Sequence, residues 1–130
     1  MHVSINTTDP RPIYVQIMDE VRRALVVGTL RSEDPLPSVR QLAADLRLNP
    51  NTVAQAYREL EREGVVYVRR GQGTFVAEQA SPAQERGALA RDVAARALLD
   101  AHRHGLGAEE LVEAIRVTAA LPHNRNGGTE

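Results

Sequence analysis

The stretch "SVRQLAADLRLNPNTVAQAYRELERE", residues 38–63, contains two apolar patterns of helical period that are separated by only three residues. Each pattern places its apolar side chains on one face of a helix, and the two predicted helices cover about 38–46 and 50–63. Their inward-facing residues are Val39, Leu42, Ala43, Leu46, Val53, Ala56, Tyr57 and Leu60. Two helices joined by so short a turn form a helix-turn-helix unit.

Capping residues mark where these helices begin. Ser38 stands at the N-cap of the first helix, and Gln41, three residues later, completes the pattern of a capping box. Asn49 stands at the N-cap of the second helix, and Pro50 occupies its first position, where a missing N–H costs nothing. The segment 29–37 before them is predicted to be a loop.

A predicted helix precedes this unit and a predicted hairpin follows it. Residues 12–27 carry apolar side chains at helical spacing, and we expect the polar residues 1–10 before them to be frayed. Two β-rich runs, 65–69 and 74–77, flank the turn Gly71-Gln72-Gly73. The predicted fold class is therefore mainly α with a small β-hairpin, a winged helix-turn-helix.

The rest of the sequence predicts a second, helical segment. A long helix, opened by the capping pattern at Ser81, extends to about His104, and a shorter helix covers 108–120. We predict a winged helix-turn-helix domain over 1–78 and a two-helix segment over 79–130, whose last residues, "PHNRNGGTE", have the composition of a disordered tail.

Composition limits the class of protein. The chain has 42% hydrophobic and 25% charged residues, as globular proteins do, and its lack of cysteine excludes disulfides and thiolate metal sites. No apolar run approaches the roughly 20 residues that span a bilayer, and the N-terminus shows no signal-peptide pattern, so we expect a cytoplasmic protein. The net charge of −1 requires any nucleic-acid contact to come from a local patch.

Uncharged polar side chains gather at the start of the second helix of the helix-turn-helix unit. A helix in the major groove of DNA reads base edges through such positions, where amides suit adenine and threonine suits thymine. Asn51, Thr52 and Gln55 point away from the predicted core and can make these contacts. On the alternative interpretation, Asn49, Asn51 and Thr52 only cap the helix.

Arginine side chains flank this polar group in the predicted fold. Arg40 lies opposite the buried face of its helix and can reach a phosphate or a guanine. Arg69 and Arg70 enter the hairpin turn, where Gly71 and Gly73 leave bare backbone for close approach to DNA. Alternatively, Arg40 is a solvated surface residue and the glycines form an ordinary tight turn.

The sequence "LPSVRQLAADLRLNPNTVAQAYRELEREGVVYVRRGQGTFV", residues 36–76, resembles the DNA-binding signature of the GntR family of transcription regulators, and "PIYVQI", residues 12–17, belongs to the same pattern. The resemblance implies that the first turn of the recognition helix, an arginine of the preceding helix and the wing contact operator DNA. The positions that match are Arg40, Asn51, Thr52, Arg70 and Gly71, with Gln55 and Gln72 as further candidates.

The C-terminal segment is similar to that of the YtrA-like subfamily, in which a short helical segment serves mainly for dimerisation and whose members often control ABC-transporter genes. The resemblance implies a repressor of a pseudo-palindromic operator. Two helices cannot enclose a drug-sized pocket, but a copy of the chain can cover their apolar stripes, so we expect a homodimer through residues 81–120. Alternatively, these helices fold back on the winged domain.

Three other functions are alternatives to DNA binding: a protein-interaction module, a metal-responsive switch and an enzyme. A winged helix can also be a protein-interaction module, which the near-neutral charge favours. A metal-responsive switch would need His102 and His104, whose side chains diverge on a helix, so we predict no metal site and no cofactor. No Ser/His/Asp set or metal-ligand spacing is present, which predicts that the protein is not an enzyme. The effector, if one exists, is not given by the sequence.

Overall fold

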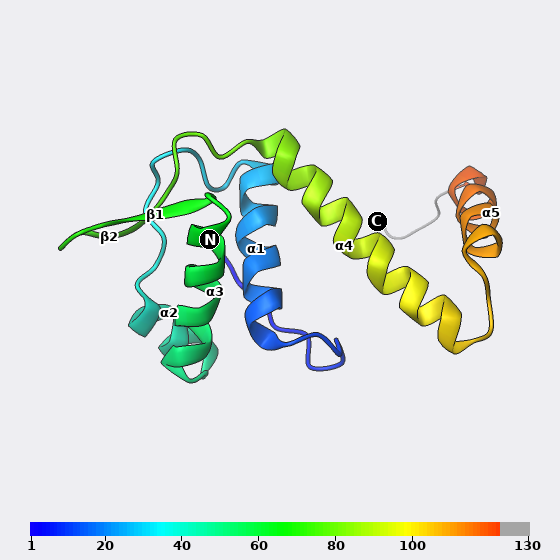
Figure 1. Cartoon of the computed structure of the whole chain (residues 1–130), viewed down its shortest axis with the longest axis horizontal. Coiled ribbons are helices and arrows are strands. Elements are labelled where there is room, and N and C mark those ends of the chain that lie inside the picture. Colours follow the sequence, from blue (N-terminus) through cyan, green and yellow to red (C-terminus); the bar gives the residue numbers. More distant parts are fainter. Residues whose placement is uncertain (123–130) are drawn as a thin grey trace. The chain divides into compact units, whose positions relative to one another are not determined.

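The computed structural model describes residues 1–122, so the predicted disordered tail lies, from residue 123 on, outside the described part. The chain forms two compact units that divide between Ala90 and Arg91. The elements in chain order are α1 (Ile13–Val27), α2 (Val39–Leu46), α3 (Pro50–Arg62), β1 (Val66–Arg69), β2 (Gly73–Val76), α4 (Pro82–Arg103) and α5 (Ala108–Ala120) (Figure 1). None of the described helices is both long and apolar enough to cross a bilayer.

The predicted fold class is confirmed, and local capping explains where the central helices begin. Ser38 Oγ accepts a hydrogen bond from the Gln41 N–H at 3.0 Å, and Asn49 Oδ1 accepts one from the Asn51 N–H at 2.8 Å. The predicted capping box at α2 is only half formed, because the Gln41 side chain donates to Asp45 Oδ1 at 2.8 Å. A contact with the next turn of the helix has replaced the contact with the cap.

The core of the first unit lies between helices and hairpin. Helix α3 packs against both α1 and α2, and β1 continues directly from the end of α3 (Figure 1). The largest fully buried side chains are Ile17, Val21, Val53, Leu60, Val66 and Val76. Each buried aliphatic side chain of this size stabilises the fold by about 1.5–3 kcal/mol, so the core fixes α3 and the hairpin on one scaffold.

The hairpin carries a third, short pairing partner that the sequence analysis assigned to a loop. β1 and β2 pair antiparallel, with Tyr67 opposite Phe75, and residues 33–36 run along the free edge of β2. The Leu36 N–H donates to the Thr74 carbonyl at 2.8 Å, and the Val76 N–H donates to the Asp34 carbonyl at 2.8 Å. The segment is a loop, as predicted, apart from an isolated bridge between Pro35 and Phe75 that was not predicted; a proline is tolerated at such an edge position.

The N-terminal residues also differ from the sequence-based expectation of a frayed segment. Val3 is only 8% exposed and belongs to the core, and the Asn6 N–H donates to Gln16 Oε1 at 2.8 Å. Arg11 bridges Asp9 and Asp19 with ion pairs of 2.8 and 2.5 Å. Met1, Val3 and Ile5 alternate with polar residues, but the polar composition of the segment as a whole led to the expectation of fraying.

A buried ion cluster forms around Arg22 of α1. Arg22 Nη1 lies 3.3 Å from Asp19 Oδ1, and Nε lies 3.2 Å from Glu85 Oε1 in the first turn of α4. A third contact joins Arg22 to Glu63, the C-cap of α3. Burial raises the pKa of Glu85, although the charge of Arg22 opposes this. One guanidinium thus holds three elements of the first unit together.

The second unit exposes most of its apolar side chains. No residue of α5 is buried, and Ile115 and Val117 are 53% and 54% exposed. Val93 and Leu99, in the part of α4 that belongs to this unit, are also exposed. Among residues 91–122, only Ala101 is buried. The apolar stripes that the sequence predicts are therefore present and uncovered within this unit.

Candidate nucleic-acid interface

The start of α3 presents free polar side chains. Asn51 and Gln55 are exposed and Thr52 is half-buried, and within residues 1–122 none of the three side chains makes a hydrogen bond. Asn49 alone is used as the cap, through its Oδ1 atom. The capping interpretation therefore accounts for Asn49, whereas the other amides remain available to bases or phosphates at a helix N-terminus.

Arg40, in the first turn of α2, is exposed beside this helix. The start of α2 is fixed to α3 because the Tyr57 hydroxyl donates to the Pro37 carbonyl at 2.7 Å. Burial raises the pKa of Tyr57, so this hydroxyl remains a donor across the physiological range. In the described part of the chain the Arg40 guanidinium has no ion pair, which leaves its charge available to a phosphate or a guanine.

The hairpin turn exposes a second polar group. The Gln72 N–H donates to the Arg69 carbonyl at 2.9 Å and closes the turn, and Arg70 and Gln72 are both exposed. Gly71 and Gly73 have φ angles of 77° and 114°, a region that side chains rarely adopt. The backbone of the turn is thus free of side chains at two positions and can approach a DNA groove closely.

Arg69 is placed differently from its neighbour Arg70. Its side chain lies on the outer face of the hairpin, half-buried against Phe75, and forms an ion pair with Glu33. Sequence reasoning did not include Glu33. The alternation in "VYVR" does put Tyr67 and Arg69 on one face, but nothing in the sequence shows that Glu33 reaches them.

The predicted site residues thus come from three places in the first unit: α2, the start of α3 and the hairpin turn. All of them are exposed or half-exposed, so none is sealed in the core. The arrangement offers amide and hydroxyl groups for base edges, together with guanidinium groups for phosphates. It is suited to reading duplex DNA.

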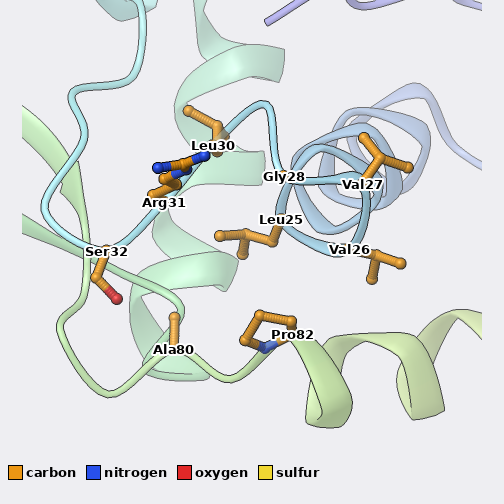
Figure 2. A pocket seen from close by; sticks show the side chains of 9 residues that line it. All are labelled: Leu25, Val26, Val27, Gly28, Leu30, Arg31, Ser32, Ala80 and Pro82. Carbon is orange, nitrogen blue, oxygen red and sulfur yellow. The ribbon is translucent and has the colours of Figure 1, made fainter.

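An open groove lies apart from the candidate interface. It has a volume of about 380 Å³ and lies between the C-terminal end of α1 and the segment before α4. Figure 2 shows its mostly aliphatic lining, with Arg31 and Ser32 as its polar members, which does not suit the charged surface of DNA.

The histidines near the end of α4 are not part of the candidate interface either. His102 and His104 are both exposed, and the described residues contain no group of three or more side chains that could hold a metal ion.

Comparison with known proteins decides the class. The sequence pattern described as "Bacterial regulatory proteins, gntR family" matches residues 13–76. The HTH-type transcriptional repressor YtrA of Bacillus subtilis is 39% identical over 117 residues, which cover 86% of this chain and 90% of that protein. The chain belongs to the GntR family. The regulator YhcF of the same organism is 43% identical over 82% of this chain and 88% of its own length.

Solved structures of GntR-family proteins agree with the fold described above. A regulator from Listeria monocytogenes has a TM-score of 0.64 at 31% identity and covers 83% of this chain and 96% of its own. YtrA from Sulfolobus acidocaldarius has a TM-score of 0.57 at 33% identity, with 71% and 97% covered. The chain is thus a sequence-specific DNA-binding regulator and not an enzyme, and the interaction-module alternative is set aside.

Proposed function

We propose that this GntR-family chain is a homodimeric repressor that binds a pseudo-palindromic operator through α3 and the hairpin turn. The observation that carries the proposal is the set of polar side chains at the N-terminus of α3 that make no hydrogen bond within residues 1–122. Asn51, Thr52 and Gln55 read base edges in the major groove, and Arg40 binds a phosphate or a guanine beside them. The proposed wing contacts are Arg70, Gly71, Gln72 and Gly73.

Repression follows from occupation of the promoter. The similarity to YtrA of Bacillus subtilis, which is named a repressor, supports this role. The resemblance to the YtrA-like subfamily suggests transporter genes as the regulated targets. A regulator of this kind meets its operator in the cytoplasm, where a sequence without cysteine is well suited.

The proposed dimer forms through residues 81–120. Isolated helices shorter than about 12–15 residues are marginal in water. Helix α5 has 13 residues and buries none of them within the described chain. A copy of the segment that covers this face supplies the missing packing and places two recognition helices about one turn of DNA apart, roughly 34 Å. In functional terms residues 1–78 bind DNA and residues 79–130 dimerise.

The test begins with selection of bound fragments from random DNA, followed by titration of the selected operator. Arg40→Ala and Arg70→Ala are each expected to weaken binding by about 1–3 kcal/mol, because each removes one well-made contact. Arg23→Ala is the matched control, because this arginine is exposed on α1, outside both the proposed DNA contacts and the proposed dimer segment. Unchanged operator affinity in both wing and α2 variants, or an equal loss in the control, would refute the assignment.

A further inference from the structure

The outer face of the hairpin carries a closed set of contacts around Arg69. Its Nε donates to the Tyr67 hydroxyl at 2.8 Å, and its Nη2 lies 3.0 Å from Glu33 Oε1. The guanidinium carbon lies 3.8 Å from the centre of the Phe75 ring. The Tyr67 hydroxyl in turn donates to the same oxygen of Glu33. The charge and one face of the guanidinium are therefore already engaged within the protein.

We infer that Arg69 is a positioning residue of the wing, which holds the turn that presents Arg70, and not itself a DNA contact. This inference rests on the proposed function. To reach a phosphate, Arg69 would have to give up its ion pair with Glu33 and its stacking on Phe75 together. Arg70, one residue later, has no such partner among residues 1–122 and is free to bind without that loss.

The backbone connects this set of contacts to the turn. Arg69 is paired with Gly73 across the hairpin, and its carbonyl accepts the hydrogen bond from Gln72 that closes the turn. A turn with two glycines is otherwise conformationally free, and ordering it on DNA would cost entropy. Fixing the Arg69 side chain against β2 reduces that cost before DNA arrives.

Glu33 is held in place for this role. Its N–H donates to the Val76 carbonyl at 2.9 Å, and its φ of 69° is a strained conformation for a residue with a side chain. The hydrogen bond from Tyr67, followed by the contact with Arg69, lowers the pKa of Glu33, so the carboxylate is charged at neutral pH. Glu33, Tyr67, Phe75 and Arg69 together are called the wing brace below.

The salt dependence of operator binding distinguishes a phosphate contact from a brace. Arg70→Ala is expected to reduce the slope of log affinity against log salt concentration by about 0.9, the value for one phosphate. Arg69→Met removes the charge but keeps an apolar stem over Phe75, and it should weaken binding several-fold with the slope unchanged. Glu33→Gln should do the same. Alternatively, Glu33 could only keep the Arg69 charge away from a DNA phosphate. Glu33→Gln would then tighten operator binding and steepen the slope, which would overturn the inference.

A double-mutant cycle tests whether the brace acts through Arg70. Arg69→Met should cost less affinity in the Arg70→Ala background than in the unmodified chain, because Arg70, the charged residue that it positions, is gone. Losses that simply add would show that Arg69 acts on DNA independently. Thermal unfolding of each variant confirms that the fold persists, and Glu33→Gln provides a second route if Arg69→Met unfolds.

A measurement without DNA separates this inference from the proposed function. Backbone order parameters of the Gly71 and Gly73 amides should fall in Arg69→Met and in Glu33→Gln relative to the unmodified chain, and should stay unchanged in Arg70→Ala. Failure of the unmodified chain to select any operator would refute the proposed function alone. Unchanged order parameters in both brace variants would refute the brace, whatever the chain binds.

Discussion

Tyr57 shows how one side chain fixes the spacing of α2 and α3. It is nearly fully buried, and its hydroxyl donates to the Pro37 carbonyl at 2.7 Å. Tyr57→Phe keeps the ring but leaves that carbonyl without its partner, so we expect the free energy of unfolding to fall by about 0.5–1.5 kcal/mol. Urea unfolding at neutral pH measures the loss, and an unchanged midpoint would contradict it.

The same residue makes the stability depend on alkaline pH. Burial raises the pKa of Tyr57, so the folded state favours the neutral phenol. Its contribution is complete below the unfolded pKa of about 10 and is lost as the pH rises above that value. The unmodified chain should therefore lose stability more steeply than Tyr57→Phe above about pH 10. Parallel pH curves for the two proteins would refute this.

At the scale of residues, the sequence indicates which side chains have the chemistry to bind DNA, but not which of them are held by other side chains of the protein. It predicted the polar start of α3, and the structure separates Asn49, which caps, from Asn51, which is free. It could not separate Arg69 from Arg70, because the difference depends on Glu33, which lies 36 residues earlier than Arg69. Only the folded chain brings that carboxylate to the hairpin.

At the scale of elements, the ion cluster around Arg22 joins α1, the end of α3 and the start of α4. The Arg22 side chain is 9% exposed, and so is that of its partner Glu85. Arg22→Met should cost about 3–5 kcal/mol of stability, because it leaves buried carboxylates without a cation. Arg23→Met is the matched control: this arginine follows on the same helix, is 57% exposed and pairs with Glu20. It should cost less than about 1 kcal/mol.

The loss in Arg22→Met should shrink in acid. Without the guanidinium, the folded-state pKa of Glu85, which burial already raises, rises further. A carboxyl group with a raised pKa favours folding at low pH and opposes it as the pH increases through that pKa. Chemical unfolding at neutral and mildly acidic pH measures the effect. A deficit that stays constant or grows on acidification would contradict the role given to Arg22.

The sequence predicts the helices and strands that have a periodic apolar pattern, but not the segments whose conformation depends on contacts with distant residues. Within residues 1–122, the five helices and both hairpin strands follow from apolar spacing, caps and glycine positions, with ends that differ from the predictions by at most one residue. The pairing of residues 33–36 with β2 was missed, because Pro35 and Pro37 dominate the local signal. The docking of Val3 and of the partly buried Ile5 was missed, because the polar composition of residues 1–10 outweighed their short alternating pattern.

At the scale of the whole molecule, operator recognition and self-association depend on each other. A monomer would bind one half-site, whereas a dimer makes the second half-site contact intramolecular and gains affinity without any new type of contact. The sequence predicts the apolar stripes of the C-terminal segment, and the second unit does expose them. In the proposed dimer a second copy of the chain covers those stripes, and mutation tests this.

Ile115 and Val117 form a matched pair for that test. Both are β-branched residues of α5, 53% and 54% exposed, and at about 100° per residue they lie on opposite sides of the helix. Ile115 shares its side with Val112, three residues earlier. Ile115→Glu should therefore reduce the sedimenting mass to one chain and weaken operator binding at least tenfold, because the linked second half-site is lost. Val117→Glu should change neither. Equal masses for the two variants, whether both dimeric or both monomeric, would refute an interface on the Ile115 side of α5.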